Sequence, residues 1–132
     1  MNSVEINGTR YVFEDLEYIE KHPYGYEGIV SLNPDASDKA YEVISDETTT
    51  NLVELLCKKP SFVKYKNFVI NLDTLKKMES SPCLIDSKMD ESKNYYTITF
   101  LSGKFFMIKE DEEGKKLKQL FDNSENAKTL GL

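Results

Sequence analysis

The sequence predicts a mainly β protein with about eight or more short strands and two short helices. Stretches rich in β-branched and aromatic residues alternate apolar and polar side chains over much of the chain, which is typical of half-buried strands. Tight-turn dipeptides, above all Asn7-Gly8 and Ser102-Gly103, separate these stretches. Leucines recur at helical spacing near residues 52–56 and 117–120, which gives the two helices. With 132 residues, the chain is expected to form a single domain.

The first half carries strand and turn signals up to its helix. Three segments have strand character: 4–13, which is expected to form a hairpin, 28–32 and 39–44. His22 and the Pro and Gly residues after it predict a loop before the second of these segments. Ser45 or Asp46 is expected to act as a helix cap, and the helix is placed at Leu52 to Lys59, where Pro60 ends it.

The second half is organised around residues 62–72, a run of β-branched and aromatic residues interrupted by Lys66-Asn67. A tight turn at this dipeptide predicts two short strands joined by a rigid corner that carries positive charge. The polar run 86–94 is expected to be an exposed connection to a further hairpin over residues 95–108. The second helix is placed at Gly114 to Phe121.

The two halves resemble each other, which predicts an internal duplication of a unit with two hairpins and a helix. A shift of 59 residues aligns the apolar positions of 4–19 with those of 63–78. The repeat halves are therefore placed at about residues 4–59 and 62–121, with a polar tail at 122–132. Chance similarity between β-rich patterns is the alternative, because alternation is common.

Apolar positions on the inward face of these elements predict the core. The expected core residues are Ile6, Tyr11, Phe13, Leu16, Ile19, Val30, Val43, Leu55, Val69, Leu72, Leu75, Ile98, Phe100, Phe106 and Ile108.

Composition excludes several classes of protein. No apolar run approaches the length that a bilayer requires, so the chain is expected to be cytoplasmic. Cys57 and Cys83 are isolated and are predicted to be structural thiols rather than a disulfide or a metal site. His22 is the single histidine and lies in no nucleophile or metal motif, so no enzyme activity, cofactor or metal is expected.

Charge is distributed unevenly along the chain, whose net charge is −6. Residues 1–60 hold five basic and twelve acidic side chains, whereas residues 61–132 hold twelve and eleven. A lysine stripe lies within the acidic protein and consists of Lys58, Lys59, Lys64, Lys66, Lys76 and Lys77. The stripe predicts either an anion-binding surface or a solvated edge strand that lysines protect from aggregation.

Residues 62–75 resemble the signature of the LytTR family, bacterial DNA-binding domains in which a strand runs into a His-Arg/Lys-Ser corner and then an apolar strand ending in Asn. Tyr65 stands at the family His, Lys66 at its basic residue and Asn67 at its Ser, while Asn71 ends the apolar strand. Residues 11–20 look like the family's entry segment, and residues 97–120 look like its final hairpin and helix. The resemblance therefore covers about residues 4–121, with no receiver domain in front.

The resemblance implies small packed β-sheets and binding of double-stranded DNA by loops that enter successive major grooves. It places these loops at residues 21–26, at 65–67 and after Ile108. The DNA-binding residues that it implies are Lys64, Tyr65, Lys66, Asn67, His22 and Lys109. Two copies are expected to read a repeated site, which implies a homodimer or paired binding.

The third implied loop departs from the family pattern, so two functions stay open. Lys109 is followed by four carboxylates, Glu110, Asp111, Glu112 and Glu113, which would repel phosphates unless they form the first turn of the last helix. Arg10 is the single arginine, and no implied loop contains it. The leading hypothesis is a DNA-binding transcriptional regulator of the LytTR type. The alternative is a DNA-binding-defective LytTR-like protein that inhibits a protein partner, such as a LytTR regulator, through residues 110–113.

Overall fold

Short antiparallel strands joined by tight turns make up most of the protein, and two helices complete it. The computed structural model describes residues 3–22, 27–33, 39–85 and 88–124, and for residues 81–94 it describes the backbone alone. Residues 34–38, the tail beyond residue 124, the Cys83 thiol and most of the implied loop at 21–26 lie outside the described residues. The mainly β class with two short helices is confirmed.

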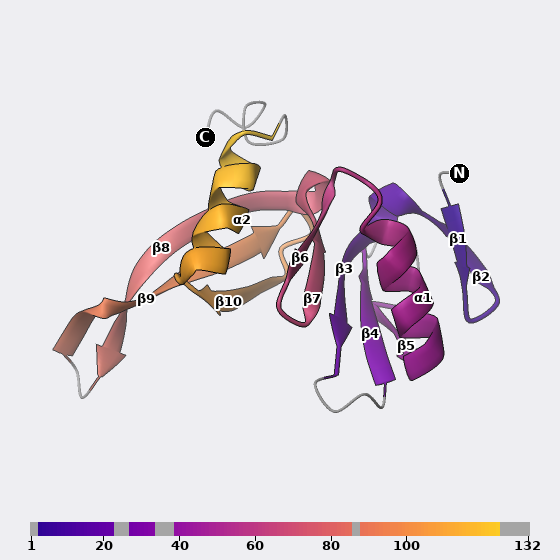
Figure 1. Cartoon of the computed structure of the whole chain (residues 1–132), viewed down its shortest axis with the longest axis horizontal. Coiled ribbons are helices and arrows are strands. Elements are labelled where there is room, and N and C mark those ends of the chain that lie inside the picture. The colour runs from indigo at the N-terminus through magenta and orange to yellow at the C-terminus, as the bar shows by residue number, and fades with distance from the viewer. Residues whose placement is uncertain (1–2, 23–26, 34–38, 86–87, 125–132) are drawn as a thin grey trace. The chain divides into compact units, whose positions relative to one another are not determined.

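The elements divide between two compact units, Met1–Thr74 and Leu75–Leu132. The first unit contains, in chain order, β1 (Ser3–Ile6), β2 (Thr9–Val12), the 3-10 turn η1 (Phe13–Asp15), β3 (Leu16–Lys21), β4 (Glu27–Leu32), β5 (Tyr41–Ser45), α1 (Asp46–Leu56), β6 (Phe62–Tyr65), β7 (Phe68–Asn71) and η2 (Leu72–Thr74). The second unit contains β8 (Leu75–Ile85), β9 (Lys88–Phe100), β10 (Phe105–Lys109) and α2 (Glu112–Asp122) (Figure 1).

The first unit is built on a five-stranded antiparallel sheet with the order β5-β4-β3-β7-β6, beside the separate β1-β2 hairpin. The helix α1 lies against β3, β4 and β5. Gly28 on β4 makes this possible, because a Cβ at this position would overlap the side chain of Thr49 on α1. Apolar residues from every layer form one buried cluster: Ile6, Tyr11, Phe13, Leu16, Ile19, Val30, Leu32, Ile44, Leu52, Leu56, Phe62 and Val69.

The second unit is a three-stranded sheet with the order β10-β9-β8, against which α2 packs. Its buried apolar side chains are Leu75, Met78, Tyr96, Ile98, Phe100, Ile108, Leu117 and Phe121. The rings of Phe100 and Phe106 lie 5.8 Å apart between centroids.

Several predicted boundaries are wrong. The helix α1 begins at Asp46, directly after its cap Ser45, and ends at Leu56, earlier at both ends than predicted. Residues 88–94, expected to be an exposed connection, extend β9, which pairs with β8 as far as Ile85. Residues 101–104, rather than a two-residue turn, connect β9 with β10.

The core prediction is wrong at Val43 and only partly correct at two other positions. Val43 is 55% exposed, whereas its neighbours Glu42 and Ile44 are buried. Leu55 and Phe106 are half-buried rather than buried. The other predicted core residues are buried.

The order of the elements is the same before and after residue 60. Strands β6 and β7, η2 and the start of β8 each lie 59 residues after β1, β2, η1 and the start of β3. Pairing does not follow this order, because β7 joins β3 whereas β2 pairs with β1 alone among the described strands. The boundary of the compact units, between Thr74 and Leu75, falls inside the second expected repeat.

Candidate functional site: a lysine-lined groove in the first unit

The corner at Lys66-Asn67 is a two-residue turn, because Tyr65 at the end of β6 pairs with Phe68 at the start of β7. Lys66 has a φ of 50°. This left-handed conformation costs an ordinary side chain roughly 1–2 kcal/mol, which is why tight hairpin turns favour Asn and Gly there. Lys66 is exposed, so the tip of the hairpin carries a positive charge although the backbone conformation of this residue is unfavourable.

Asn67 fastens this tip to the end of β3. The backbone N–H of Lys21 donates to the carbonyl oxygen of Asn67 at 2.7 Å, and the Asn67 Nδ2 donates to the carbonyl oxygen of Lys21 at 3.1 Å. The corner and the strand that leads into the 21–26 segment are therefore one rigid frame. One hydrogen of the Asn67 amide is engaged in this frame and is not available to a base edge.

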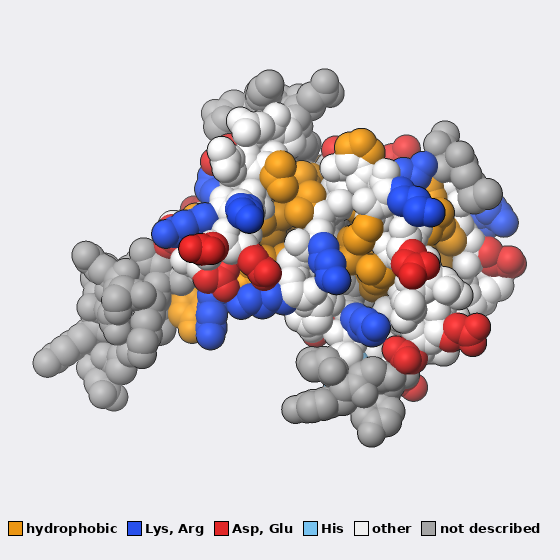
Figure 2. Space-filling view, viewed as in Figure 1, with side chains coloured by type: hydrophobic (Ala, Val, Ile, Leu, Met, Phe, Trp, Pro, Cys, Tyr) orange, Lys and Arg blue, Asp and Glu red, His pale blue; other side chains and the backbone are white. Residues whose placement is uncertain are grey.

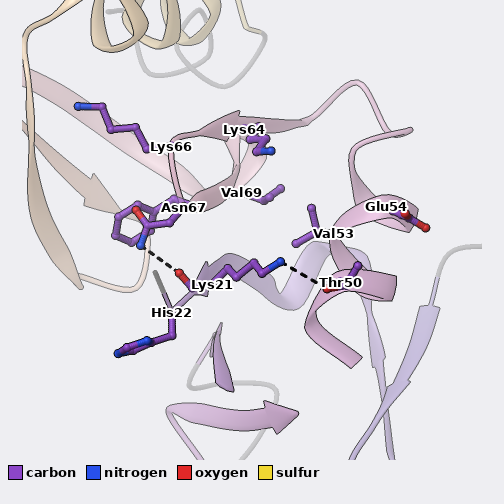
Figure 3. A pocket seen from close by; sticks show the side chains of 10 residues that line it. Lys21, His22, Thr50, Val53, Glu54, Lys64, Lys66, Asn67 and Val69 are labelled. Carbon is purple, nitrogen blue, oxygen red and sulfur yellow. Dashed lines mark hydrogen bonds between the residues drawn. The ribbon is translucent and has the colours of Figure 1, made fainter. Parts of the chain in front are cut away.

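A groove of about 620 Å³ lies beside this frame. The hairpin, β3 and α1 all contribute to its lining: Lys21, His22, Thr50, Val53, Glu54, Lys64, Lys66, Asn67, Phe68 and Val69. Figure 3 shows Lys21 reaching across the groove towards α1, where its Nζ lies 3.5 Å from the Thr50 Oγ1, with Lys64 and Glu54 on opposite walls. Figure 2 shows lysines beside exposed apolar side chains between the β6–β7 hairpin and α1.

The groove carries three lysines and a single carboxylate, that of Glu54, among the described residues that line it. Lys64 has no hydrogen-bond or ion-pair partner within the described part of the chain. Lysine ammonium groups are compact, strongly hydrated charges that bind phosphates and carboxylates. Chemically, therefore, the groove favours an anion.

The structure brings four of the predicted site residues together and separates two. Lys64, Lys66, Asn67 and His22 all line the groove. Tyr65, implied to pack at a DNA groove, is instead 4% exposed and belongs to the interior, so that implication is wrong. Its ring lies 5.3 Å from the Lys66 Nζ, which places the ammonium over the aromatic face.

Lys109 and the acidic run belong to the second unit. Lys109 is exposed at the end of β10. Asp111 caps α2 by accepting from the Gly114 N–H at 2.8 Å, and Glu110 accepts from the Ser80 hydroxyl at 3.0 Å. Glu112 and Glu113 occupy the first turn, near the positive end of the helix dipole. The interpretation of this run as a helix start is confirmed, and two of its four carboxylates serve the protein's own structure.

The lysine stripe is divided between the units. Lys58, Lys59, Lys64 and Lys66 belong to the first unit, and Lys76 and Lys77 follow Leu75 at the start of β8 in the second. The Lys59 Nζ lies 5.1 Å from the Phe13 ring centroid, and Lys77 forms an ion pair with Glu79 at 3.0 Å.

Sequence reasoning missed the α1 wall of the groove and the role of Lys21. Thr50, Val53 and Glu54 are spaced as neighbours on one helix face, and this spacing was the available signal. What faces that side of the helix depends on long-range packing, which the spacing alone does not give.

Within the described residues, no helix is long and apolar enough to cross a membrane, and no cluster of His, Cys, Asp or Glu is suited to hold a metal ion. Comparison with protein-family models, with curated proteins and with solved structures finds no significant match to this chain.

Proposed function

We propose that the protein is a bacterial transcriptional regulator of the LytTR type that binds double-stranded DNA through the lysine-lined groove and the adjoining hairpin tip. One observation carries the proposal. Lys21 ends β3, whereas Lys64 on β6 and Lys66 in the β6–β7 turn follow more than 40 residues later, yet all three line one groove whose frame is fixed by the two hydrogen bonds between Lys21 and Asn67. Such a regulator acts in the cytoplasm and, as the family resemblance implies, reads a repeated site as two copies.

Electrostatics supports phosphate contacts better than base contacts at this surface. Each phosphate neutralised contributes about −0.9 to the slope of log affinity against log salt concentration, so three lysines give a slope of roughly −3. Lys66 suits a phosphate because it projects from a rigid turn. Asn67 suits a base edge less well, because part of its amide is already engaged with Lys21.

The test is a fluorescence-anisotropy titration of the full chain against a pool of promoter duplexes at several salt concentrations. Lys64→Ala and Lys66→Ala are each expected to weaken binding and to reduce the salt slope by about one. Lys116→Ala is the matched control, because Lys116 is an exposed lysine on α2 and does not line the groove. No binding by the wild type, or equal loss in all three variants, contradicts the proposal.

A second function, capture of a basic protein partner, is favoured by the two exposed carboxylates of Glu112 and Glu113. Because Asp111 and Glu110 are engaged within the unit, the acidic surface available to a partner is this pair. A Glu112→Gln, Glu113→Gln double variant keeps the helix cap. This second function predicts that the double variant loses a LytTR-type regulator in a binding assay, whereas the DNA-binding function predicts duplex binding that is unchanged or tighter. Retention of the regulator by the double variant excludes this surface.

A further inference from the structure

The groove has an apolar floor that contact with a phosphate backbone does not use. Val69 on β7 forms this floor beside Val53 on the α1 wall, and Val69 is 2% exposed. The Phe68 ring packs edge-on against Tyr18, with centroids 5.9 Å apart, on the opposite face of the sheet, because Phe68 and Tyr18 alternate with Val69 and Ile19 along the paired strands. A volume of about 620 Å³ lies within the range of pockets that hold small organic molecules, which are mostly apolar with a few charged groups.

The charges around the floor are arranged asymmetrically. Lys21 is half-buried and crosses the groove towards Thr50, and Lys64 stands on the hairpin wall. Glu54 lies on the opposite wall, on α1. A negative group near Lys21 and Lys64 gains two charge-assisted contacts, whereas the same group near Glu54 is repelled.

We propose that this groove binds a small aromatic organic acid, with its ring against Val53 and Val69 and its acid group between Lys21 and Lys64. This inference goes beyond DNA binding, because it requires no nucleic acid. A ligand held in this way neutralises two of the lysines assigned to DNA, so it competes with the duplex.

The test uses two fluorescent probes that share an aromatic body and differ in charge. 8-Anilinonaphthalene-1-sulfonate carries one sulfonate, and N-phenyl-1-naphthylamine lacks it. The folded full chain is expected to bind the sulfonate at one site, about tenfold more tightly than the neutral probe, because a hydrogen bond to a charged group contributes about that factor. Equal affinity for the two probes, or no binding of the sulfonate, overturns the proposal.

Two variants, one that removes a positive charge and one that removes a negative charge, make the test specific to this groove. Lys64→Met keeps the aliphatic stem and is expected to weaken sulfonate binding about fivefold, whereas Glu54→Gln removes the repelling charge and is expected to strengthen it about twofold. Lys116→Met is the control and is expected to leave the affinity unchanged. Circular dichroism confirms the fold of each variant. If Lys64→Met behaves like Lys116→Met, the acid group is not bound here.

These titrations contain no DNA, so the two proposals fail separately. Sulfonate binding that depends on Lys64, in a protein that binds no duplex, leaves this inference standing and removes the proposed function. Duplex binding without sulfonate binding does the reverse. Where both occur, the sulfonate probe is expected to displace the duplex. Simultaneous binding of probe and duplex contradicts the inference that they compete for the same lysines.

Discussion

Asn71 joins the two 3-10 turns of the first unit, and replacing it is expected to destabilise that unit strongly. Its side chain is 1% exposed. The Nδ2 donates to the carbonyl oxygens of Phe13 at 3.3 Å and Leu16 at 2.9 Å, and the Oδ1 accepts from the Asp73 N–H at 3.1 Å. One side chain thus ties η1 to the start of η2, 58 residues away in sequence at the Phe13 contact.

The magnitude can be worked out from these three bonds. Each net hydrogen bond contributes about 1 kcal/mol, and a buried partner left without its bond costs more than the bond itself contributes. Asn71→Leu is therefore expected to lower the unfolding free energy by about 3 kcal/mol, although the apolar side chain avoids the desolvation of the amide.

Asn71→Asp separates the loss of hydrogen bonds from a change of shape. An ionised carboxylate facing two carbonyl oxygens is unfavourable, so the pKa of the introduced carboxyl lies above its usual value of about 4. The folded variant then binds more protons than the unfolded chain, and its unfolding free energy falls as pH rises through the raised pKa. Asn71→Leu has no group to titrate and is expected to lack this dependence.

Urea denaturation followed by circular dichroism over a range of pH measures both effects. Asn51→Leu and Asn51→Asp are matched controls, because Asn51 is exposed on α1, and such changes usually stay within about 0.5 kcal/mol. If Asn71→Leu is as stable as Asn51→Leu, the side chain does not hold the two turns together.

Three further predictions concern packing, capping and ionisation. Gly28→Ala is expected to lower the unfolding free energy by about 1–3 kcal/mol in urea denaturation, because its Cβ overlaps Thr49; Thr49→Ala in the same chain is expected to restore part of the loss. Asp111→Ala removes the acceptor of the Gly114 N–H and is expected to cost about 1 kcal/mol by the same measurement, whereas Asp111→Asn keeps the cap and most of the stability. Burial raises the pKa of Tyr18 above its ordinary value of 10.0. The folded state therefore binds more protons than the unfolded chain, and stability is lost as pH rises beyond 10. In thermal unfolding at alkaline pH, Tyr18→Phe is expected to lose less stability than the wild type as pH rises. Equal losses of stability in the two proteins contradict this account.

Local sequence signals predicted the hairpins well. The prediction of buried residues from the alternation of apolar and polar side chains failed where a polar residue faces the interior. In β5 the exposed residues include Val43, and the inward residues are Glu42 and Ile44. Glu42 is accommodated because the Tyr11 hydroxyl lies 3.4 Å from its Oε2 and the Lys39 ammonium 3.2 Å from its Oε1. Both partners come from outside β5, so a hydrophobicity pattern within the strand assigns the wrong face.

Whole strands were missed for a related reason. Strand β8 begins with Leu75 but continues through Lys76, Lys77 and Glu79, and this density of charge hides its alternation. In the same way, the sequence predicts the part of the groove that consecutive residues form, but not the wall that long-range packing brings against it. The Lys66-Asn67 turn is specified by local sequence, whereas the α1 wall is placed by the close approach of Gly28 to Thr49.

The two hairpin tips show where the sequence departs from what the fold favours. Asn7 and Lys66 are 59 residues apart in equivalent turns, and they are the non-Gly residues with positive φ in the described part of the chain, at 51° and 50°. Each tip is fastened by an Asn amide, with Asn7 donating to the Val43 carbonyl oxygen at 2.9 Å and Asn67 donating to that of Lys21. Asn suits the left-handed conformation and Lys does not. The conformation of the turn therefore does not favour Lys66 over Asn.

Lys66→Asn is accordingly expected to stabilise the fold while weakening duplex binding. Relief of the left-handed conformation contributes about 1 kcal/mol, and loss of the exposed ammonium over the Tyr65 ring costs about 0.5 kcal/mol, so the expected net gain is about 0.5 kcal/mol. Urea denaturation measures the gain, and the anisotropy titration measures the loss of affinity and of about one from the salt slope. A variant that is less stable and binds DNA as the wild type does would show that Lys66 is retained for the turn itself rather than for its charge.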